Sequence, residues 1–487
     1  GEQVLVLLPE IALTSEFFNR VKNRFGANPA EWHSGATLAE RRRIWKMVAS
    51  GGAKLVIGAR SALFLPFMNL GLVIVDEEHD HSYKQEDGVI YNARDMAVLR
   101  SSIEGIPVIL ASATPSLESW VNAKNGKYNH VQIHERFGQA TLPSLSVVDL
   151  RTENLKSDEW ISDSLEKSIT ECLNNEEQSL LFLNRRGYSP TTVCRACGNQ
   201  ISCDECDARM VEHRFINRLM CHQCGHTKAM PHKCPSCGIK GKLAVVGPGV
   251  ERLAEEAQIK FPKAVISVLS SDLYGSAKSL KNEIQKISEG NTDIIIGTQL
   301  VAKGHNFPKL RLVGVIDIDI GLQGSDLRAA ERTYQLVRQV SGRAGRKDNK
   351  GRALIQTYQP EHPVVEAIIK GDDDEFWVSE AKQRELASMP PFGKLVGIII
   401  SSSNFENAMF LANQLKTSTQ ALDIIGARVY GPAPAPIARI KRRHRIRFLV
   451  KSPRTPGLQD AIRKWVATGS LKGDLRLSID IDPQSFY

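Results

Sequence analysis

Short apolar runs rich in valine and isoleucine recur along most of the chain, and amphipathic helical stretches separate them. This alternation is typical of parallel β-sheets that carry helices on both faces. The predicted strands are Val4–Leu8, Lys54–Ile57, Leu72–Val75, Pro107–Leu110, Leu180–Leu183, Val265–Val268, Asp293–Ile296, Leu312–Ile316 and Ala353–Gln356. They suffice for two such sheets, so we expect two α/β lobes over residues 1–137 and 138–375.

The pattern changes beyond the second lobe. A charged helical segment at Asp372–Leu386 leads into the turn Met389–Phe392. Strands are then predicted near Val396–Ser401, Arg447–Val450 and Arg476–Ile481, with a helix at Glu406–Ala421. We therefore expect an α+β domain over residues 376–487, in which Pro432–Pro436 forms a rigid, extended link.

Eight of the nine cysteines form four Cys-x-x-Cys pairs inside the second lobe. The pairs are Cys194/Cys197, Cys203/Cys206, Cys221/Cys224 and Cys234/Cys237. Two pairs complete one closed, tetrahedral structural zinc site, so four pairs give two sites in adjacent, interleaved or nested combination. The hairpin-sized gap between the two middle pairs favours nesting. Disulfides are the alternative, but they are typical of short secreted chains. We expect residues 191–243 to be an insertion that folds on its metals.

The ninth cysteine, Cys172, stands in a helical pattern and is predicted to pack as a small apolar residue.

A cluster of carboxylates follows the apolar strand Leu72–Val75 at once: Asp76, Glu77 and Glu78, with His79 after them. Ligands bind at this end of the strands in an open parallel sheet. One carboxylate there can bind Mg²⁺, and its neighbour can orient or deprotonate the water that attacks a γ-phosphate. We assign Asp76 to magnesium and Glu77 to water; an ordinary acidic loop is the alternative.

The segment Ser112–Thr114 follows the next predicted strand. Its hydroxyls are expected to hydrogen-bond to His79, which would link the nucleotide to a neighbouring surface.

A second motif, Gln339–Arg346, ends the helical stretch Leu327–Val340. Gln339, Arg343 and Arg346 stand at i, i+4 and i+7 and are predicted to share one helix face. Guanidinium groups there would neutralise charge on a transferred phosphoryl group. Surface salt bridges are the alternative.

A third motif follows the strand Asp293–Ile296. It places small, hydroxyl and basic side chains at the carboxyl end of that strand, where they fit contacts to a nucleic-acid backbone. The candidates are Thr298, Gln299, Lys303 and His305. A simple strand-to-helix turn is the alternative.

Basic residues also crowd one segment near the C-terminus: Arg439, Lys441, Arg442, Arg443, Arg445, Arg447 and Lys451. They form either a phosphate-binding face or a strand edge guarded by charge. The net charge of +9 is compatible with a nucleic-acid partner. The 42% hydrophobic and 24% charged residues are those of a soluble globular protein, without a membrane-length apolar run or a signal peptide.

These motifs together resemble the PriA family of bacterial replication restart helicases, also called primosomal protein N′. The resemblance also rests on Leu8–Thr14, Ile57–Phe64, Leu181–Gly187 and Asp480–Pro483, and it covers essentially the whole chain. It implies a superfamily 2 helicase core of two RecA-like lobes, which hydrolyses Mg-ATP in the cleft between them and moves 3′ to 5′ on DNA. It also implies nested zinc sites, with Cys194, Cys197, Cys234 and Cys237 on one ion and Cys203, Cys206, Cys221 and Cys224 on the other.

The resemblance further implies partners and a location. The partners are forked and single-stranded DNA, the single-strand-binding protein, and the primosome proteins PriB, DnaT and the DnaB–DnaC loading system. The expected location is the bacterial cytoplasm, at the nucleoid.

Two features depart from the family pattern. The phosphate loop Gly-x-x-x-x-Gly-Lys-Ser/Thr is not among these residues, so we expect the chain to begin partway through a domain and to be a poor ATPase as given. In the loop after the acidic cluster, Val89 stands where tryptophan is expected. Candidates for coupling to DNA there are Tyr83, Lys84, Tyr91 and Arg94. A zinc-bearing adaptor without enzymatic activity and an RNA translocase are the alternative functions.

Overall fold

The computed structural model describes most of the 487 residues. The described ranges are 1–9, 15–86, 88–133, 143–156, 159–184, 191–204, 210–213, 218–220, 226–241, 243–246, 250–269, 277–302, 307–322, 327–345, 351–440 and 442–485. The chain divides into two compact units, Gly1–Trp120 and Val121–Tyr487, which are treated separately below. Among the described residues, no helix is long and apolar enough to cross a bilayer.

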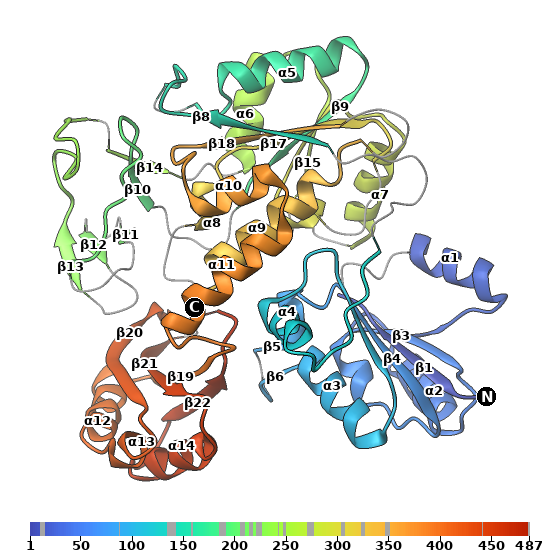
Figure 1. The fold of residues 1–487 in the computed structure, drawn as a ribbon, viewed down its shortest axis with the longest axis vertical. Coiled ribbons are helices and arrows are strands. Elements are labelled where there is room, and N and C mark those ends of the chain that lie inside the picture. Colours follow the sequence, from blue (N-terminus) through green and yellow to red (C-terminus); the bar gives the residue numbers. More distant parts are fainter. Residues whose placement is uncertain are drawn as a thin grey trace. The chain divides into compact units, whose positions relative to one another are not determined.

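The first unit is built on a parallel sheet in the strand order β2-β3-β1-β4-β7. Figure 1 draws this sheet in blue and labels β1, β3 and β4. The strands of the sheet are β1 (Gln3–Leu7), β2 (Ala30–Trp32), β3 (Leu55–Gly58), β4 (Leu70–Asp76) and β7 (Val108–Ala111). The helices are α1 (Ser15–Phe25), α2 (Leu38–Ala49), α3 (Ala93–Glu104) and α4 (Leu117–Lys124), with the 3₁₀ turns η2 (Arg60–Phe64) and η3 (His81–Tyr83). A short ribbon pairs β5 (Lys84–Gln85) with β6 (Tyr91–Asn92).

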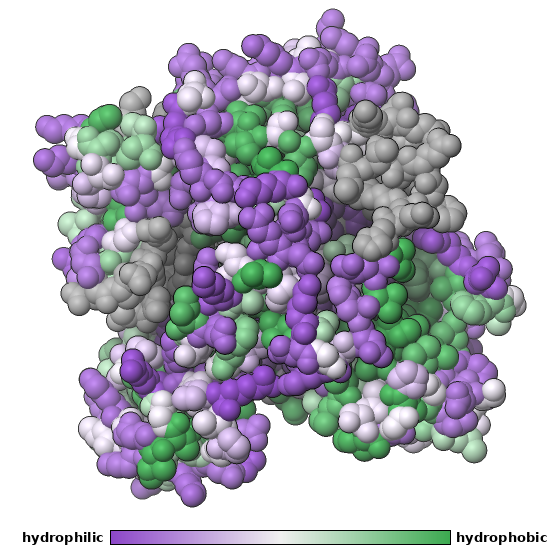
Figure 2. Space-filling model, in the orientation of Figure 1, coloured by the Kyte–Doolittle hydropathy of each residue, from purple (hydrophilic) through white to green (hydrophobic). Residues whose placement is uncertain are grey.

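Local sequence fixes where these helices begin and end. α2 begins at a capping box, in which the Thr37 hydroxyl accepts from the Glu40 N–H and the Glu40 carboxylate accepts from the Thr37 N–H. α3 ends at Gly105, whose φ of 67° suits a residue without a Cβ. Leu5, Val56 and Val73 are fully buried where the strands meet. Other apolar side chains of this unit stay exposed, and Figure 2 shows them as green surface.

The second unit contains a larger parallel sheet in the order β15-β16-β9-β17-β18-β8. Its strands are β8 (Ser144–Asp149), β9 (Gln178–Phe182), β15 (Ile266–Leu269), β16 (Ile294–Gly297), β17 (Leu310–Val315) and β18 (Arg352–Thr357). The helices are α5 (Asp163–Asn174), α6 (Val250–Lys260), α7 (Ala277–Ser288), α8 (Asp319–Leu322), α9 (Ala329–Ser341) and α10 (Pro363–Lys370). The predicted α/β class and the nine predicted strands are confirmed. Cys172 is fully buried on α5, as expected.

An antiparallel sheet interrupts this lobe between β9 and α6, as the predicted insertion requires. Its strands are β10 (Thr191–Cys194), β11 (Val211–His213), β12 (Arg218–Met220), β13 (Thr227–Ala229) and β14 (Leu243–Val246), in the order β13-β12-β11-β10-β14. We call Thr191–Val246 the zinc element. Its own buried cluster contains Ile201, Met210 and Leu219 besides Cys203. Among the described residues this core is small, so the element is expected to depend on its metals for stability.

The C-terminal domain follows α11 (Asp373–Leu386). Its antiparallel sheet has the order β20-β21-β19-β22, built from β19 (Gly393–Ser402), β20 (Arg428–Ile440), β21 (Arg443–Pro453) and β22 (Arg476–Ile481). The helices are α12 (Phe405–Lys416), α13 (Gln420–Asp423) and α14 (Leu458–Ala467). Trp465 and Phe448 meet edge to face in its core.

Two predictions for this domain were wrong. Pro432–Pro436 is not a link but part of β20, an edge strand whose pairing with β21 shifts register on both sides of these prolines. Prolines are tolerated there because an edge strand needs only some of its N–H groups for pairing. The predicted helix Glu406–Ala421 ends at Lys416, and α13 follows as a separate turn.

Candidate nucleotide site and zinc centre

The acidic motif lies at the carboxyl end of β4, between β1 and β7 in the first unit. Asp76 is the last residue of the strand, and the Tyr83 hydroxyl hydrogen-bonds to its carbonyl at 2.6 Å and to that of Leu7 at 3.0 Å. Glu77 turns the chain at a φ of 49°, and its N–H donates to the Asp76 carboxylate at 3.0 Å. A left-handed residue that is not glycine costs energy and is found most often at functional sites.

Burial raises the pKa of the Asp76 carboxyl, against smaller opposite effects of the Glu77 N–H and His79. A bound divalent cation would reverse this shift, because it favours the ionised carboxylate. An oxygen ligand at this edge of the sheet suits Mg²⁺, which is bound in such sites through one or two carboxylates and the phosphates of its nucleotide. Asp76 therefore fits the ion that was assigned to it.

His79 connects this turn to the next strand. Its Nδ1 lies 2.7 Å from the Ser112 hydroxyl and 3.6 Å from the Glu77 carboxylate. The Ser112 hydroxyl also accepts from the N–H of Thr114 at 3.0 Å. The predicted hydrogen bond between His79 and the segment after the neighbouring strand is confirmed.

Glu78 does not belong with Asp76 and Glu77, which corrects its assignment to the catalytic set. Its side chain is buried and accepts from the Ser116 N–H at 2.6 Å, the Ser116 hydroxyl at 3.0 Å and the Ser119 hydroxyl at 2.9 Å. The Arg94 guanidinium lies 3.3 Å from the same carboxylate. These partners surround the start of α4, where a carboxylate is stabilised by the helix dipole. Glu78 therefore fixes α4 rather than facing a ligand.

Three of the four candidates for coupling to DNA in the following loop have buried side chains. Tyr83, Lys84 and Arg94 are buried within the first unit, which leaves them a coupling role at most. Tyr91 is half-buried and meets the exposed ring of Phe64 edge to face, with 5.1 Å between the ring centroids. Of the four, Tyr91 is the one that keeps a partly accessible side chain.

In the second unit, Thr298 and Gln299 follow β16 directly, and Gln299 opens the turn η5 (Gln299–Ala302). Gly297 permits this turn, because a Cβ there would lie 2.3 Å from the Val301 side chain. Helix α9 packs against η5. The arginine motif and the third motif are thus neighbours in one lobe.

The helix face predicted to be shared by Gln339 and Arg343 was wrong. α9 ends at Ser341, and the N–H groups of Arg343 and Ala344 bond three residues back, to Val340 and Ser341. This tighter winding rotates Arg343 away from its helical position. The Arg343 side chain is buried, and Gln339 is half-buried on the last turn of α9.

Some predicted residues lie outside the described part of the chain: Cys206, Cys221, Cys224, Lys303, His305, Arg346 and, in the basic segment, Lys441.

Elsewhere in the basic segment the arginines separate into two groups. Arg443 binds the Asp474 carboxylate at 3.2 Å, and Arg447 is buried. Arg439 and Arg442 are exposed near the turn between β20 and β21.

Sequence analysis missed a buried pair of carboxylates, Asp317 and Asp319, at the carboxyl end of β17. The Asp319 carboxylate accepts from the Thr357 hydroxyl and the Tyr358 N–H, both at 2.6 Å. Burial raises the pKa of Asp319 to about 6. The signal that identified Asp76, an acidic residue directly after an apolar strand, is also present here.

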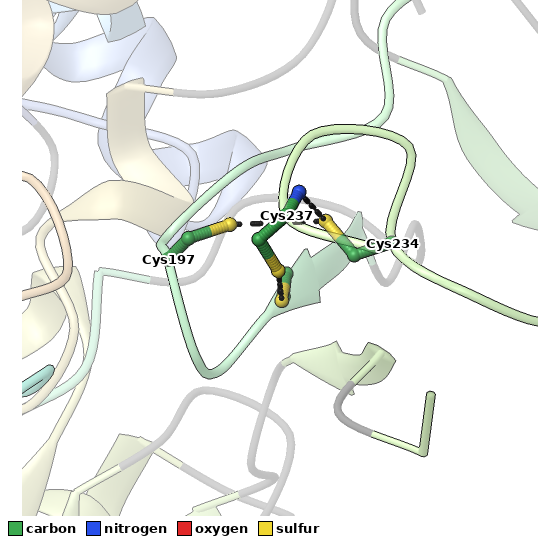
Figure 3. A group of neighbouring side chains, drawn as sticks. Cys197, Cys234 and Cys237 are labelled. Atoms are coloured by element: carbon green, nitrogen blue, oxygen red, sulfur yellow. Dashed lines mark hydrogen bonds between the residues drawn. The ribbon is translucent and has the colours of Figure 1, made fainter. Parts of the chain in front are cut away.

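Among the described residues, Cys194, Cys197, Cys234 and Cys237 converge, with their four sulfurs within 4.8 Å of one another. Figure 3 shows the side chains of Cys197, Cys234 and Cys237 in this group. The sulfurs of Cys194 and Cys237 lie 3.7 Å apart, as do those of Cys197 and Cys234. A tetrahedral Zn²⁺ with bonds of about 2.3 Å separates its sulfurs by about 3.8 Å. The residues therefore fit zinc, and the outer pairs meet as nesting requires.

These four cysteines form a stable group of thiolates only when a cation is bound, because without one their protonated form is favoured. Burial raises the pKa of the Cys194 thiol to about 12. Burial also raises that of Cys234, but the N–H groups of Cys237 and Ser236 and the neighbouring thiols outweigh it and lower the pKa to about 7. Zinc binds thiolates, so its charge stabilises the deprotonated set. Cys203 is buried in the described part of the inner group, whose site stays a prediction.

The first cysteine turn docks on the second lobe. Val193 shares a buried cluster with Val148, Leu150 and Tyr358. Gly198 has a φ of 71°, and a Cβ there would lie 2.7 Å from the Tyr358 carbonyl oxygen. The backbone of this turn thus touches the chain directly after β18.

We expect Gly198→Ala to dislodge the zinc element while both zinc ions stay bound, because the added methyl overlaps the Tyr358 carbonyl. The measurement is the rate of limited proteolysis within Thr191–Val246, together with zinc content. Gly238→Ala is the matched control: it follows Cys237 as Gly198 follows Cys197 and has a φ of 73°, but nothing lies within 4 Å of its Cβ position. Equal protease sensitivity of the two variants would contradict the docking.

Family models match successive parts of the chain. Residues 1–122 match the DEAD/DEAH box helicase model and 235–348 the helicase conserved C-terminal domain. Residues 203–228 match the PriA DNA helicase Cys-rich region, and 385–484 the primosomal protein N C-terminal domain. The chain is also 41% identical over 487 residues to the replication restart protein PriA of Rickettsia felis, covering all of this chain and 75% of that protein. The chain belongs to the PriA family.

Other PriA proteins match along almost the whole chain. The Bacillus subtilis protein is 38% identical, and the match covers 99% of this chain and 60% of that protein. The Haemophilus influenzae protein is 37% identical, and the match covers 99% of this chain and 66% of that protein. Among solved structures, the chain is similar to RecG bound to a three-way DNA junction, with a TM-score of 0.44 and 14% sequence identity. The match covers 79% of this chain and 40% of the RecG chain. The matching family models and the PriA relatives show that the chain carries the two RecA-like helicase domains, the Cys-rich zinc region and the C-terminal domain of an ATP-dependent DNA helicase of the PriA family.

Proposed function

We propose that the complete protein couples ATP hydrolysis to 3′ to 5′ movement on DNA, recognises stalled or branched forks and promotes primosome assembly. The observation that carries the proposal is the turn after β4. It presents Asp76 and Glu77 at the ligand-binding end of a parallel sheet and connects them through His79 to Ser112. A connection of this kind can link the state of a nucleotide to the segment after β7.

Each motif has a proposed role in this cycle. Asp76 binds the magnesium of Mg-ATP, and Glu77 orients or deprotonates the attacking water. Gln339, Arg343 and Arg346 neutralise charge on the phosphates. The residues proposed to contact the DNA backbone are Thr298, Gln299, Lys303 and His305.

The family relation supports the proposed partners and location. The partners are the single-strand-binding protein, PriB, DnaT and the DnaB–DnaC loading system, where the host has them. The proposed location is the cytoplasm, at the nucleoid. The exposed Arg439 and Arg442 suit contact with a phosphate backbone in the C-terminal domain.

The test compares DNA substrates of equal length. The rate of ATP hydrolysis by the complete gene product is measured with a forked DNA, with a linear duplex of the same length and with the corresponding RNA fork. We expect the forked DNA to stimulate hydrolysis most. Equal stimulation by the linear duplex would contradict fork recognition, and a stronger response to RNA would favour the translocase on RNA. Binding of the fork without hydrolysis would favour the adaptor.

A further inference from the structure

Helix α9 connects two places that differ in function. Its C-terminal end precedes Arg343 by two residues. Its 13 residues make it about 20 Å long. Near its other end, the Arg332 guanidinium donates to the carbonyl of Gln484, which follows the last strand of the C-terminal domain. Whatever holds α9 in place therefore also determines where Arg343 lies.

α11 holds α9 through side chains on one face of each helix, a contact that we call the α9–α11 seam. Figure 1 labels the ribbons of the two helices. The residues of the seam are Arg328, Glu331, Tyr334 and Arg338 on the α9 side and Asp373, Phe376, Trp377, Glu380 and Arg384 on α11. Arg338 pairs with the start of α11 and Glu331 with its end, so the helices run in opposite directions.

The half of the seam nearer Arg343 is aromatic. The ring of Tyr334 stacks on Phe376 with 3.7 Å between centroids and 5° between planes, and Trp377 meets both rings edge to face. The Tyr334 hydroxyl and the Arg338 guanidinium both bind the Asp373 carboxylate, the guanidinium at 3.1 Å. Offset and edge-to-face aromatic contacts fix geometry as well as contributing buried area.

The other half is a buried ion network. Arg384 lies 2.7 Å from the Glu331 carboxylate and 2.8 Å from that of Glu380, and Arg328 lies 3.4 Å from Glu331. All four side chains are buried, so the network contains two buried cations and two buried anions. A buried network of this kind contributes little net stability relative to apolar residues of similar volume, but it can fix one register of the helices that it joins.

Arg384 extends this network to the C-terminal domain. Its third nitrogen donates to the Pro390 carbonyl at 3.3 Å, in the turn that leads into β19. One guanidinium thus contacts α9, its own helix and the entry into the C-terminal domain. A displacement of that turn is transmitted to α9 through rigid, directional contacts.

We propose that the α9–α11 seam couples the C-terminal domain to the phosphate-binding arginine, and that Glu331 and Arg384 are positioning residues for ATP hydrolysis. This inference rests on the proposed role of Arg343. DNA bound by the C-terminal domain would act on the turn at Pro390, and the seam would then set the position of Arg343 at the far end of α9.

The test uses the double variant Glu331→Leu/Arg384→Met in the complete gene product. It removes one charge of each sign, so the net charge of the network is unchanged, although Arg328 and Glu380 each lose one close ion-pair partner. The measurement is the ratio of kcat for ATP hydrolysis with forked DNA to kcat without DNA. We expect this ratio to fall by about two- to thirtyfold, the range found for residues that carry coupling between sites. The KM for ATP is expected to stay near that of the wild type. Thermal stability is expected to fall, because two buried charges each lose a close partner, so the ratio is measured at a temperature at which the variant is folded.

The matched control is Asp460→Leu/Arg463→Met, which removes an exposed pair of the same charges, 3.0 Å apart, on α14 of the C-terminal domain. Its stimulation ratio should equal that of the wild type. Should the seam variant fail to fold, Tyr334→Phe decides, because it keeps the ring stack and removes the hydrogen bond to Asp373. An unchanged ratio in either folded variant would overturn the inference.

Arg343→Ala separates this failure from a failure of the proposed function. If Arg343→Ala hydrolyses ATP at the wild-type rate, the proposed function of Arg343 in hydrolysis is wrong. The α9–α11 seam would then position no residue that acts in hydrolysis. If Arg343→Ala is inactive while the seam variants respond to DNA normally, only the coupling is refuted.

Discussion

Replacing Glu77 with glutamine in the complete protein is expected to slow ATP hydrolysis by about 10²–10⁴-fold without weakening the binding of nucleotide or DNA. Glutamine keeps the size of the side chain but cannot accept a proton from water. The Glu77 carboxylate is partly exposed, and it lies 3.6 Å from the His79 imidazole. The measurements are steady-state hydrolysis and the affinity for a labelled ATP analogue.

Two further variants make this expectation specific. Glu104→Gln changes a carboxylate of similar exposure on α3 of the same unit and should leave hydrolysis intact. Glu78→Gln should lower thermal stability, because it weakens the acceptor for Ser116, Ser119 and Arg94. A folded Glu78→Gln protein that has lost hydrolysis, beside an active Glu77→Gln protein, would reverse the assignment of the two carboxylates.

Replacing Cys234 with alanine is expected to reduce bound zinc from about two ions per chain to about one and to unfold the base of the zinc element. Structural zinc contributes roughly 10–16 kcal/mol of apparent binding free energy in small metal-folded domains, far more than the small apolar cluster of this element can replace. The measurements are metal analysis and proteolysis within Thr191–Val246. The parallel sheet of the first unit should keep its thermal transition, because its buried core and the cluster of the zinc element have no described residue in common.

Cys172→Ala is the control for this prediction. Cys172 is buried on α5 and lies outside the metal-binding group of the described residues. Its replacement should leave both zinc ions bound. Two ions per chain in the Cys234→Ala protein would show that another residue completes the site.

The sequence predicted the central strands well because they are buried on both sides. Every residue of β9 and β16 is buried, and their short apolar runs are typical of strands at the centre of a parallel sheet. β8 was missed because it is an edge strand whose sequence, Ser-Leu-Ser-Val-Val-Asp, mixes polar and apolar residues. β2 was missed because three residues are too short for a pattern.

The candidate site was predicted in outline, and its details depend on the backbone. Three adjacent carboxylates look alike in the sequence, and the left-handed turn at Glu77 decides that Glu78 points into the unit. Likewise, helical spacing was extended past Gly342, where the winding changes. The outer zinc group was easier to predict, because a Cys-x-x-Cys turn determines its own local geometry.

The zinc element also has a closed stem. Its first strand, β10, pairs along its whole length with its last, β14, from Thr191 opposite Val246 to Cys194 opposite Leu243. The chain therefore leaves the lobe and returns to it at neighbouring points. Beyond the turn at Gly198, which touches the lobe at Tyr358, a change in the length of the zinc element would leave both ends of the stem in place, so this part of the element is a module distinct from the parallel sheet.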